Sequence, residues 1–275
     1  MLKNRKLLID KDCPMCNLYG KCFTKIGLLE KNTISPYQTI PNFYASQIDM
    51  HRAKNEIALL NTEDASTIYG IDAMIEIASH DSTFFKKILH SKIVYTLLQG
   101  LYSFISYNRK VIYPTIVDLT GRNCTPDLNK KWRWSYIIFV AIFTGIVLNQ
   151  YAFHINMALG WEHHWSRELY ICFGQVAWQM TAISLFHKNK TLEYLGNMST
   201  VSMIGGVLLL PILFLNSIFQ FSLIGLLLAF GLVVGIMLLE HIRRCKLLGF
   251  SLWMTGSWVM FRTVVLLLIL FFRFF

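Results

Sequence analysis

Long apolar segments in the second half of the chain constrain its fold more than any other feature. Residues 201–240 form one apolar stretch, about twice the ~20 residues that a helix needs to cross a bilayer. The polar residues Asn216, Ser217 and Gln220 lie near its middle and predict a turn there. Five membrane-spanning helices are predicted, over residues 134–153, 168–186, 199–216, 221–240 and 250–272.

Charged residues are concentrated before these segments. The chain has 26 Lys and Arg and 16 Asp and Glu residues, and 30 of these 42 lie at or before Arg133. A polar half suited to water therefore precedes an apolar half suited to lipid. We predict a water-soluble domain over residues 1–127 and an all-α transmembrane bundle over residues 128–275. A hydrophobic content of 54% also excludes a disordered protein.

The cations beside the apolar segments predict how the chain is oriented. One predicted side of the membrane carries eight of them: Lys130, Lys131, Arg133, Lys188, Lys190, Arg243, Arg244 and Lys246. The other side carries only Arg167 and Arg273. The positive-inside rule then predicts an integral protein of the inner or plasma membrane, with a cytoplasmic N-terminal domain and an external C-terminus. Because membrane orientation accounts for these cations, the net charge of +10 does not predict a nucleic-acid partner.

Short periodic patterns predict an α/β fold with a mixed sheet for the first domain. Strands are expected over residues 6–10, 33–40, 57–60 and 66–69. Helices are expected over residues 13–30, 71–79, 84–89 and 94–107. Pro36 places the second strand at a sheet edge, because proline has no amide hydrogen to donate to a neighbouring strand.

A Cys-x-x-Cys motif lies where the first predicted strand leads into the first predicted helix. A thiolate is the nucleophile of thiol–disulfide exchange, and a helix N-terminus favours a thiolate by lowering the thiol pKa. Cys13 is expected to be the exposed, attacking thiol, and Cys16 the thiol that resolves the mixed disulfide. Asp10 or Asp12 is the candidate group that exchanges a proton with Cys16.

The two residues between the cysteines are candidates for substrate contact. Pro14 suits the first turn of a helix, where a missing amide hydrogen costs nothing, and Met15 follows it. The competing interpretation is half of a metal site, with the cysteine pair binding a soft ion such as Cu(I) or Zn²⁺. Cys22, Cys124 and His51 form no second ligand pair with suitable spacing, so we expect no metal site and no cofactor.

Four segments in order resemble the DCC family of predicted thiol–disulfide oxidoreductases, also known as domain of unknown function 393. They are the Asp-x-x-Cys-x-x-Cys motif ending at Cys16 and residues 70–74, 101–109 and 121–124. The resemblance covers about residues 5–127 and implies a thioredoxin-like fold, with dithiol chemistry at Cys13 and Cys16. It says nothing about the predicted spans or about the substrate.

Arg262 is a charged residue in the middle of the last predicted span. A charge there costs about 2.5–3.5 kcal/mol on insertion scales, so it must face a partner or water. Gln175 and Gln179, one turn apart in the second span, are the candidate partners, and Trp258 is placed to stack on the guanidinium. Two interpretations stay open: a functional site, or a hydrogen-bond clamp between helices.

The sequence favours a membrane-anchored thiol–disulfide oxidoreductase. Its expected partners are the lipid bilayer, a protein or small-molecule disulfide and a partner membrane protein. One alternative is a non-catalytic assembly or metal-handling module. Another is a bundle that is itself an enzyme or transporter, with a regulatory first domain. Cys172 is the only cysteine within a predicted span, which disfavours electron transfer across the bilayer through a thiol pair.

Overall fold

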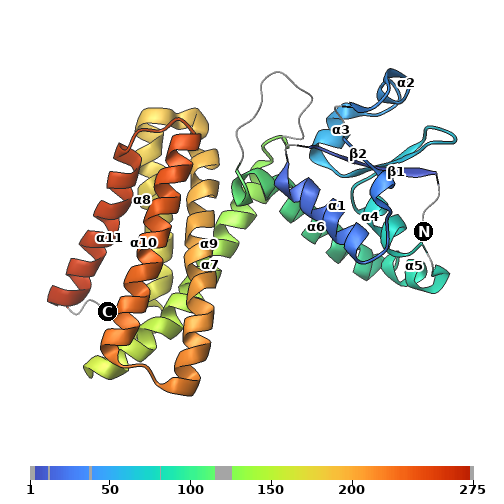
Figure 1. Cartoon of the computed structure of the whole chain (residues 1–275). Helices are drawn as coiled ribbons and strands as arrows, with labels where there is room; N and C mark the ends of the chain where they lie inside the picture. Colours follow the sequence, from blue (N-terminus) through green and yellow to red (C-terminus); the bar gives the residue numbers. More distant parts are fainter. Residues whose placement is uncertain (1–3, 12, 37–38, 81, 115–125, 273–275) are drawn as a thin grey trace. The chain divides into compact units, whose positions relative to one another are not determined.

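The computed structural model describes residues 4–11, 13–36, 39–80, 82–114 and 126–272 (Figure 1). The chain divides into two compact units, residues 1–132 and 133–275. The first is a small α/β unit, and the second is a bundle of long helices.

Four short strands form a mixed sheet in the first unit. They are β1 (Arg5–Ile9), β2 (Ile34–Pro36), β3 (Ala58–Asn61) and β4 (Thr67–Tyr69), in the order β2-β1-β3-β4. β1 runs parallel to β2 and antiparallel to β3, and β3 is antiparallel to β4. The predicted α/β class with a mixed sheet is confirmed. The strand that contains Pro36 lies at the sheet edge, as predicted.

Within the described residues, six α-helices and one complete 3-10 helix accompany the sheet. They are α1 (Pro14–Lys25), η1 (Lys31–Thr33), α2 (Asn42–Ala45), α3 (Met50–Asn55), α4 (Gly70–Ala78), α5 (Thr83–Leu89) and α6 (Lys92–Ile112). The helix predicted over residues 13–30 is wrong beyond Lys25, because Gly27 adopts a φ of +78° and turns the chain. The sequence patterns also missed α2 and α3, which are too short to show a full apolar period.

The sheet buries a separate apolar cluster on each face. Leu7, Ile9 and Leu59 point to one face, together with Cys16 from α1. Leu8, Ala58 and Leu60 point to the other. This alternation follows from the two-residue period of a strand, which sends successive side chains to opposite faces. Cys16 is therefore anchored in the core beside the carboxyl end of β1.

In the part of the second unit that the structure describes, there are five α-helices, with a 3-10 turn between two of them. They are α7 (Lys130–Leu159), α8 (Arg167–His187), η3 (Lys188–Lys190), α9 (Thr191–Phe219), α10 (Leu223–Leu247) and α11 (Trp253–Phe272). Within the described residues, four helical segments are long and apolar enough to cross a membrane: Lys130–Leu159, Arg167–Phe219, Leu223–Leu247 and Trp253–Phe271.

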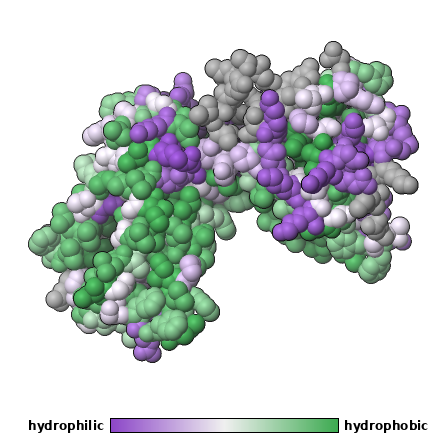
Figure 2. All heavy atoms as spheres, viewed as in Figure 1, coloured by the Kyte–Doolittle hydropathy of each residue, from purple (hydrophilic) through white to green (hydrophobic). Residues whose placement is uncertain are grey.

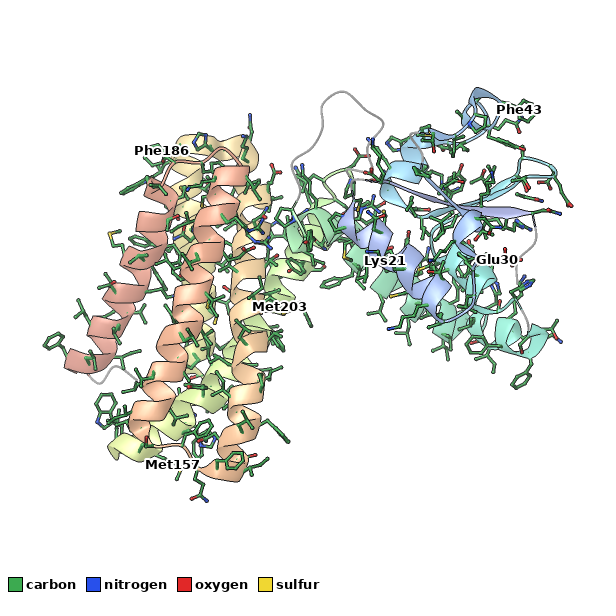
Figure 3. All side chains as sticks on the ribbon, viewed as in Figure 1. Lys21, Glu30, Phe43, Met157, Phe186 and Met203 are labelled. Carbon is green, nitrogen blue, oxygen red and sulfur yellow. The ribbon has the colours of Figure 1, made fainter. Side chains whose placement is uncertain are left out.

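The second of these segments is too long for a single crossing. Its 53 residues contain α8, η3 and α9. A straight helix of that length would extend about 80 Å, more than twice the ~30 Å hydrocarbon core. Helix α8 instead packs against α9, so the segment folds back at η3. Figure 3 shows Met157, near the end of α7, and Phe186, near the end of α8, at opposite ends of the bundle.

The outer surface of the bundle is apolar. Figure 2 shows most of the visible bundle surface in green, the colour of hydrophobic residues. Phe214, Leu228 and Leu232 are each about two-thirds exposed, and many other large apolar side chains of the bundle are also exposed. Monomeric soluble proteins rarely show apolar surface this continuous, whereas lipid-facing helices do. The apolar composition of these helices and their apolar outer surface both indicate membrane association.

The connections between the helices depend on polar residues. The predicted turn near Gln220 is confirmed, since α9 ends at Phe219 and Gln220 adopts a left-handed φ of 49°. The Asn216 side chain accepts a hydrogen bond of 2.9 Å from the Phe221 amide. The span predicted over residues 221–240 is wrong at its end. Helix α10 continues to Leu247, so Arg243 and Arg244 belong to its last turns and not to the connection that follows.

Glycines allow close approach at some helix contacts and not at others. A Cβ atom added at Gly145 in α7 would lie 3.2 Å from the Leu169 backbone in α8. Gly231 and Gly235 in α10 are exposed and have no neighbour within 4 Å of such an atom. The Gly-x-x-x-Gly spacing in α10 therefore makes no tight contact within the described chain.

We expect Gly145→Val to destabilise the bundle, because the added atoms meet backbone that cannot move aside. Overpacking of this kind costs about 1–3 kcal/mol. Thermal unfolding of the purified protein in a non-ionic detergent measures the effect. Gly231→Val is the matched control and should unfold at nearly the wild-type temperature. Equal losses in both variants would contradict the contact between α7 and α8.

Candidate functional site

The Cys-x-x-Cys motif lies at the start of α1, directly after β1. The Cys13 amide donates to the Asp10 carbonyl at 3.1 Å, and the Asn17 side chain donates to the Lys11 carbonyl at 2.8 Å. These bonds close the short connection between the strand and the helix. Cys13 has extended backbone angles and is the N-cap residue, and Pro14 is at the first helical position. The expected strand-to-helix junction is present.

The two motif cysteines differ in exposure. Cys13 is partly exposed, whereas Cys16 is 7% exposed. Both are free thiols, as are the other described cysteines, Cys22, Cys172 and Cys245. One accessible and one buried sulfur within a single helical turn is the arrangement that attack and resolution require.

The electrostatics of Cys13 differ from the sequence-based expectation. A helix N-terminus predicts a lowered pKa, but the hydrogen bond between Cys13 and Cys16 holds the pKa of the Cys13 thiol well above its usual value. Partial burial raises this pKa further, and the positive charge of Arg109 lowers it. The neighbouring thiol therefore outweighs the helix terminus in setting the Cys13 pKa.

A small cavity lies beside Cys16 and is lined by polar side chains from two helices and from the segment that precedes β3. Its volume is about 10 Å³, about the smallest space that holds one water molecule. The polar lining residues are Tyr19 from α1, Glu56 before β3, and Tyr102, Ser106 and Arg109 from α6. The buried sulfur thus faces a site where a proton can be passed to or from a polar group.

Two residues of α6 hold this site together. The Tyr102 hydroxyl accepts a 2.7 Å hydrogen bond from the Ile57 amide just before β3, and burial raises the pKa of that hydroxyl. The Arg109 guanidinium donates to the Lys54 carbonyl in the last turn of α3. Arg109 therefore secures a helix end, and its charge also acts on Cys13.

The acidic candidates occupy different positions. Asp10 is 4% exposed, but it does not line the cavity beside Cys16. Asp12 lies outside the described residues. The acidic residue that lines this cavity is Glu56, which sequence reasoning missed, and its carboxylate also pairs with Arg52 at 3.3 Å. No local motif marks Glu56, because it comes near Cys16 only when β3 pairs with β1. Met15 is partly exposed on α1.

The intramembrane candidates are only partly brought together. Arg262 and Gln175 line one cavity of about 250 Å³ inside the bundle. Gln179 does not line this cavity, and its side-chain carbonyl accepts a 2.7 Å hydrogen bond from Tyr194. The Arg262 guanidinium lies 5.6 Å from the centre of the Trp258 ring, as the predicted stacking requires.

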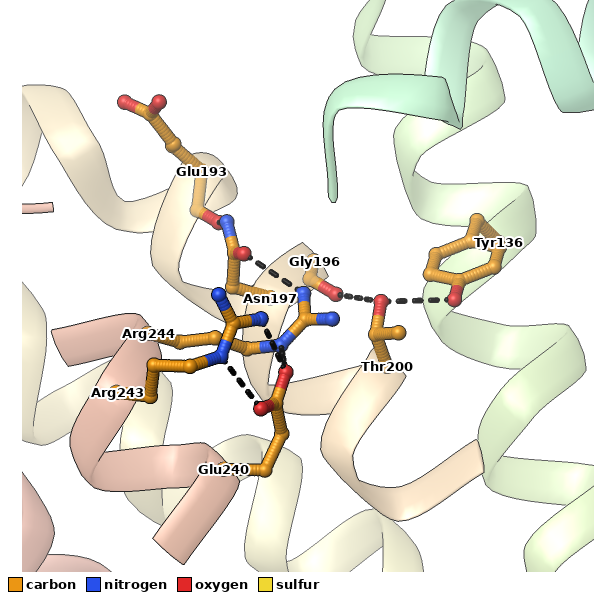
Figure 4. Close-up of polar contacts among 8 residues, drawn as sticks. All are labelled: Tyr136, Glu193, Gly196, Asn197, Thr200, Glu240, Arg243 and Arg244. Carbon is orange, nitrogen blue, oxygen red and sulfur yellow. Dashed lines mark hydrogen bonds and ion pairs between the residues drawn. The ribbon is translucent and has the colours of Figure 1, made fainter. Parts of the chain in front are cut away.

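A separate polar cluster lies between α9 and α10 (Figure 4). Glu240 accepts hydrogen bonds of 2.6–2.7 Å from Arg243 and Arg244, and Arg244 also donates to Asn197 at 2.9 Å. Arg244 is 4% exposed, so one of the predicted membrane-flanking cations is a buried cross-link between helices. The Lys190 ammonium donates a hydrogen bond of 3.4 Å to the Leu248 carbonyl. The connection between α8 and α9 and the connection between α10 and α11 therefore lie at the same end of the bundle.

Comparisons with known proteins add no relative. No family model, curated protein or solved structure matches this chain. Among the residues that the structure describes, no group of three or more His, Cys, Asp or Glu side chains is arranged to hold a metal ion. What the chain shows by itself is a small α/β unit with a close cysteine pair, followed by helices long enough to cross a membrane.

We expect Cys16→Ala to make Cys13 more reactive at neutral pH. Removing Cys16 removes the hydrogen bond that raises the Cys13 pKa. A thiol whose pKa falls by about one has about ten times more thiolate below that pKa. The rate of iodoacetamide alkylation at Cys13, followed by mass spectrometry from pH 6 to 9, measures the change.

Arg109→Gln should have the opposite effect, because it removes the charge that lowers the same pKa. Exposed Cys22 is an internal reference whose alkylation should not change in either variant. Slower alkylation of Cys13 in Cys16→Ala, or faster alkylation in Arg109→Gln, would contradict the electrostatics described above.

Proposed function

We propose that this protein is a membrane-anchored thiol–disulfide oxidoreductase with a thioredoxin-like N-terminal domain. One observation carries the proposal: a partly exposed thiol and a buried thiol share the first turn of a helix that directly follows the central strand β1. A parallel strand–helix–strand unit followed by an antiparallel β-hairpin supports the thioredoxin-like assignment.

The reaction is an exchange of disulfides in two steps. The Cys13 thiolate attacks a substrate disulfide, forms a mixed disulfide and releases the first substrate thiol. The Cys16 thiolate then attacks Cys13 and releases the second substrate thiol, which leaves the Cys13–Cys16 disulfide on the protein. The substrate gains two electrons and two protons, and the protein loses them. A cytoplasmic dithiol or small-molecule thiol must restore the reduced pair.

The residues around Cys16 have separate roles in this proposal. Glu56 accepts the Cys16 proton before the second step, across the small cavity that both residues line. Arg109 favours the Cys13 thiolate through its charge, which offsets part of the effect of Cys16. Pro14 and Met15, between the two cysteines, contact the substrate. Asp10 stabilises the connection from β1.

The bundle anchors this domain to the inner or plasma membrane. The fold-back at η3 supports five crossings, which place the two ends of the chain on opposite sides. The positive-inside rule assigns the cationic end of the bundle, and with it the N-terminal domain, to the cytoplasm. In that reducing compartment the cysteine pair rests as a dithiol and acts as a reductant.

Trapping the mixed disulfide tests the enzymatic proposal. We expect Cys16→Ser in the full-length protein to accumulate a stable mixed disulfide at Cys13, because the resolving thiol is absent. Non-reducing electrophoresis and mass spectrometry of the trapped species identify the substrate. The wild-type protein should also reduce the disulfides of insulin in the presence of a thiol reductant, and Cys13→Ser should not.

Cys22→Ser is the matched control for this experiment. Cys22 is on the same helix but exposed, so its loss should leave insulin reduction unchanged. The absence of a trapped species in Cys16→Ser, together with an inactive wild-type protein, would refute the proposal. A soft metal ion that stays bound at one per chain through purification would support a metal-handling module instead.

The orientation is tested with the native Cys22, which is exposed on the first unit. We expect a membrane-impermeant maleimide to label Cys22 only after the cells are permeabilised, because the reagent cannot reach a cytoplasmic domain. A variant with Cys22→Ser gives the background from other cysteines. Labelling in intact cells would place the domain outside, and an oxidising compartment would then reverse the direction of electron flow.

A further inference from the structure

A partly open cavity inside the bundle is lined by all five α-helices described in the second unit. Its volume is about 250 Å³, and α7, α8, α9, α10 and α11 each contribute to its walls. Most of the lining is apolar and includes Leu209, Phe230 and Val233. Ligand sites in proteins range from about 300 to 1,000 Å³, so this space suits a small or single-chain molecule.

Several polar groups on its wall have no hydrogen-bond partner among the described residues. Gln175 is 1% exposed, and neither its amide nitrogen nor its carbonyl oxygen is bonded. The Ser199 hydroxyl and the Trp258 indole nitrogen are also unbonded, although these residues are 3% and 2% exposed. Leaving such a buried group unpaired costs about 1–3 kcal/mol. Groups of this kind, gathered around one space, point to a ligand that pairs with them.

Arg262 adds a positive charge to the same wall. No acidic side chain of the described chain lies within ion-pair distance of it, and the structure gives its guanidinium no hydrogen bond. Glu168 also lines the cavity, but its carboxylate is paired with Arg167 at 2.8 Å. The guanidinium contacts the face of Trp258, which orients the charge without neutralising it. A clamp between helices would show bonds from Arg262 to Gln175 or Gln179, and none is present in the described residues.

We infer that this cavity binds a single-chain amphipathic anion, with its carboxylate or phosphate at Arg262 and its hydrocarbon chain along the apolar wall. The guanidinium, the Trp258 indole, the Ser199 hydroxyl and the Gln175 amide all donate hydrogen bonds, and an anionic oxygen accepts them. A neutral ligand would satisfy the amide and the indole but would leave the partly buried arginine charge without a partner. This site is independent of the dithiol chemistry.

Equilibrium dialysis of the full-length protein in a non-ionic detergent tests the site, with radiolabelled decanoate as the probe. We expect saturable binding of one decanoate per chain. Decanol has the same chain without the charge and controls for partition into micelles, so it should not bind saturably. Decyl phosphate, run in parallel, decides whether the preferred head group is a carboxylate or a phosphate.

Substitutions connect the binding to these residues. Arg262→Gln should weaken binding by at least about tenfold, because it removes charge-assisted hydrogen bonds. Arg262→Lys keeps the charge and should restore part of the affinity. Gln175→Met is a second variant of similar volume and should also weaken binding. Lys188→Gln is the matched control, since Lys188 is exposed in η3 and outside the cavity.

Three results would overturn the inference. They are no saturable binding of either anion, equal binding of decanol and decanoate, and undiminished binding by both Arg262→Gln and Gln175→Met. Circular dichroism and size-exclusion chromatography check that each variant is folded. If Arg262→Gln does not fold, Gln175→Met decides the outcome by the same criterion.

Discussion

The long apolar helices of the second half pair their own backbone amides and carbonyls, which is what a membrane-crossing segment requires. In hydrocarbon, each unpaired group costs several kcal/mol, so helices are the stable solution for apolar segments of this length. The same constraint explains where polar side chains lie. The Asn216 side chain accepts a hydrogen bond from the turn between α9 and α10. Arg244 donates one hydrogen bond to Glu240 and another to Asn197. Polar residues are buried there because each one has a partner.

The cavity around Arg262 departs from this rule within the described chain. Tyr194 shows the usual behaviour, since its hydroxyl lies within hydrogen-bond distance of both Gln179 and His241. Gln175, one turn away from Gln179 on the same helix, has no such partner. Two glutamines that look equivalent in sequence therefore differ in their surroundings. Gln179 bonds to Tyr194 through its carbonyl, although its amide nitrogen is unbonded, whereas Gln175 lines the cavity with neither polar atom bonded.

Local sequence patterns predicted some features of the α/β unit and missed others. The strand-to-helix junction at Cys13 and the edge position of β2 follow from local rules, because Pro36 and the cysteine spacing carry their own physical reasons. The end of α1 at Lys25 and the helices α2 and α3 were not predicted. Those features depend on a single glycine turn and on segments too short for periodicity.

The surroundings of the dithiol could not be predicted for a different reason. Glu56 and Arg109 are 40 and 93 residues from Cys16 in the sequence, and only the sheet and α6 bring them to its cavity. The pKa of Cys13 also depends on the tertiary structure. The helix N-terminus acts through local structure, but the contact with Cys16 and the charge of Arg109 depend on side-chain placement.

The sequence by itself determined the division of this chain into a polar half and a membrane-length half, since hydropathy and charge are local properties that sum along a segment. It also determined the position of the cysteine pair at a strand-to-helix junction. Only the tertiary structure decided which buried polar groups are paired, because pairing depends on distances between helices remote in sequence. That is why Arg244 is a cross-link and Arg262 lines a cavity, although both are arginines within apolar helices.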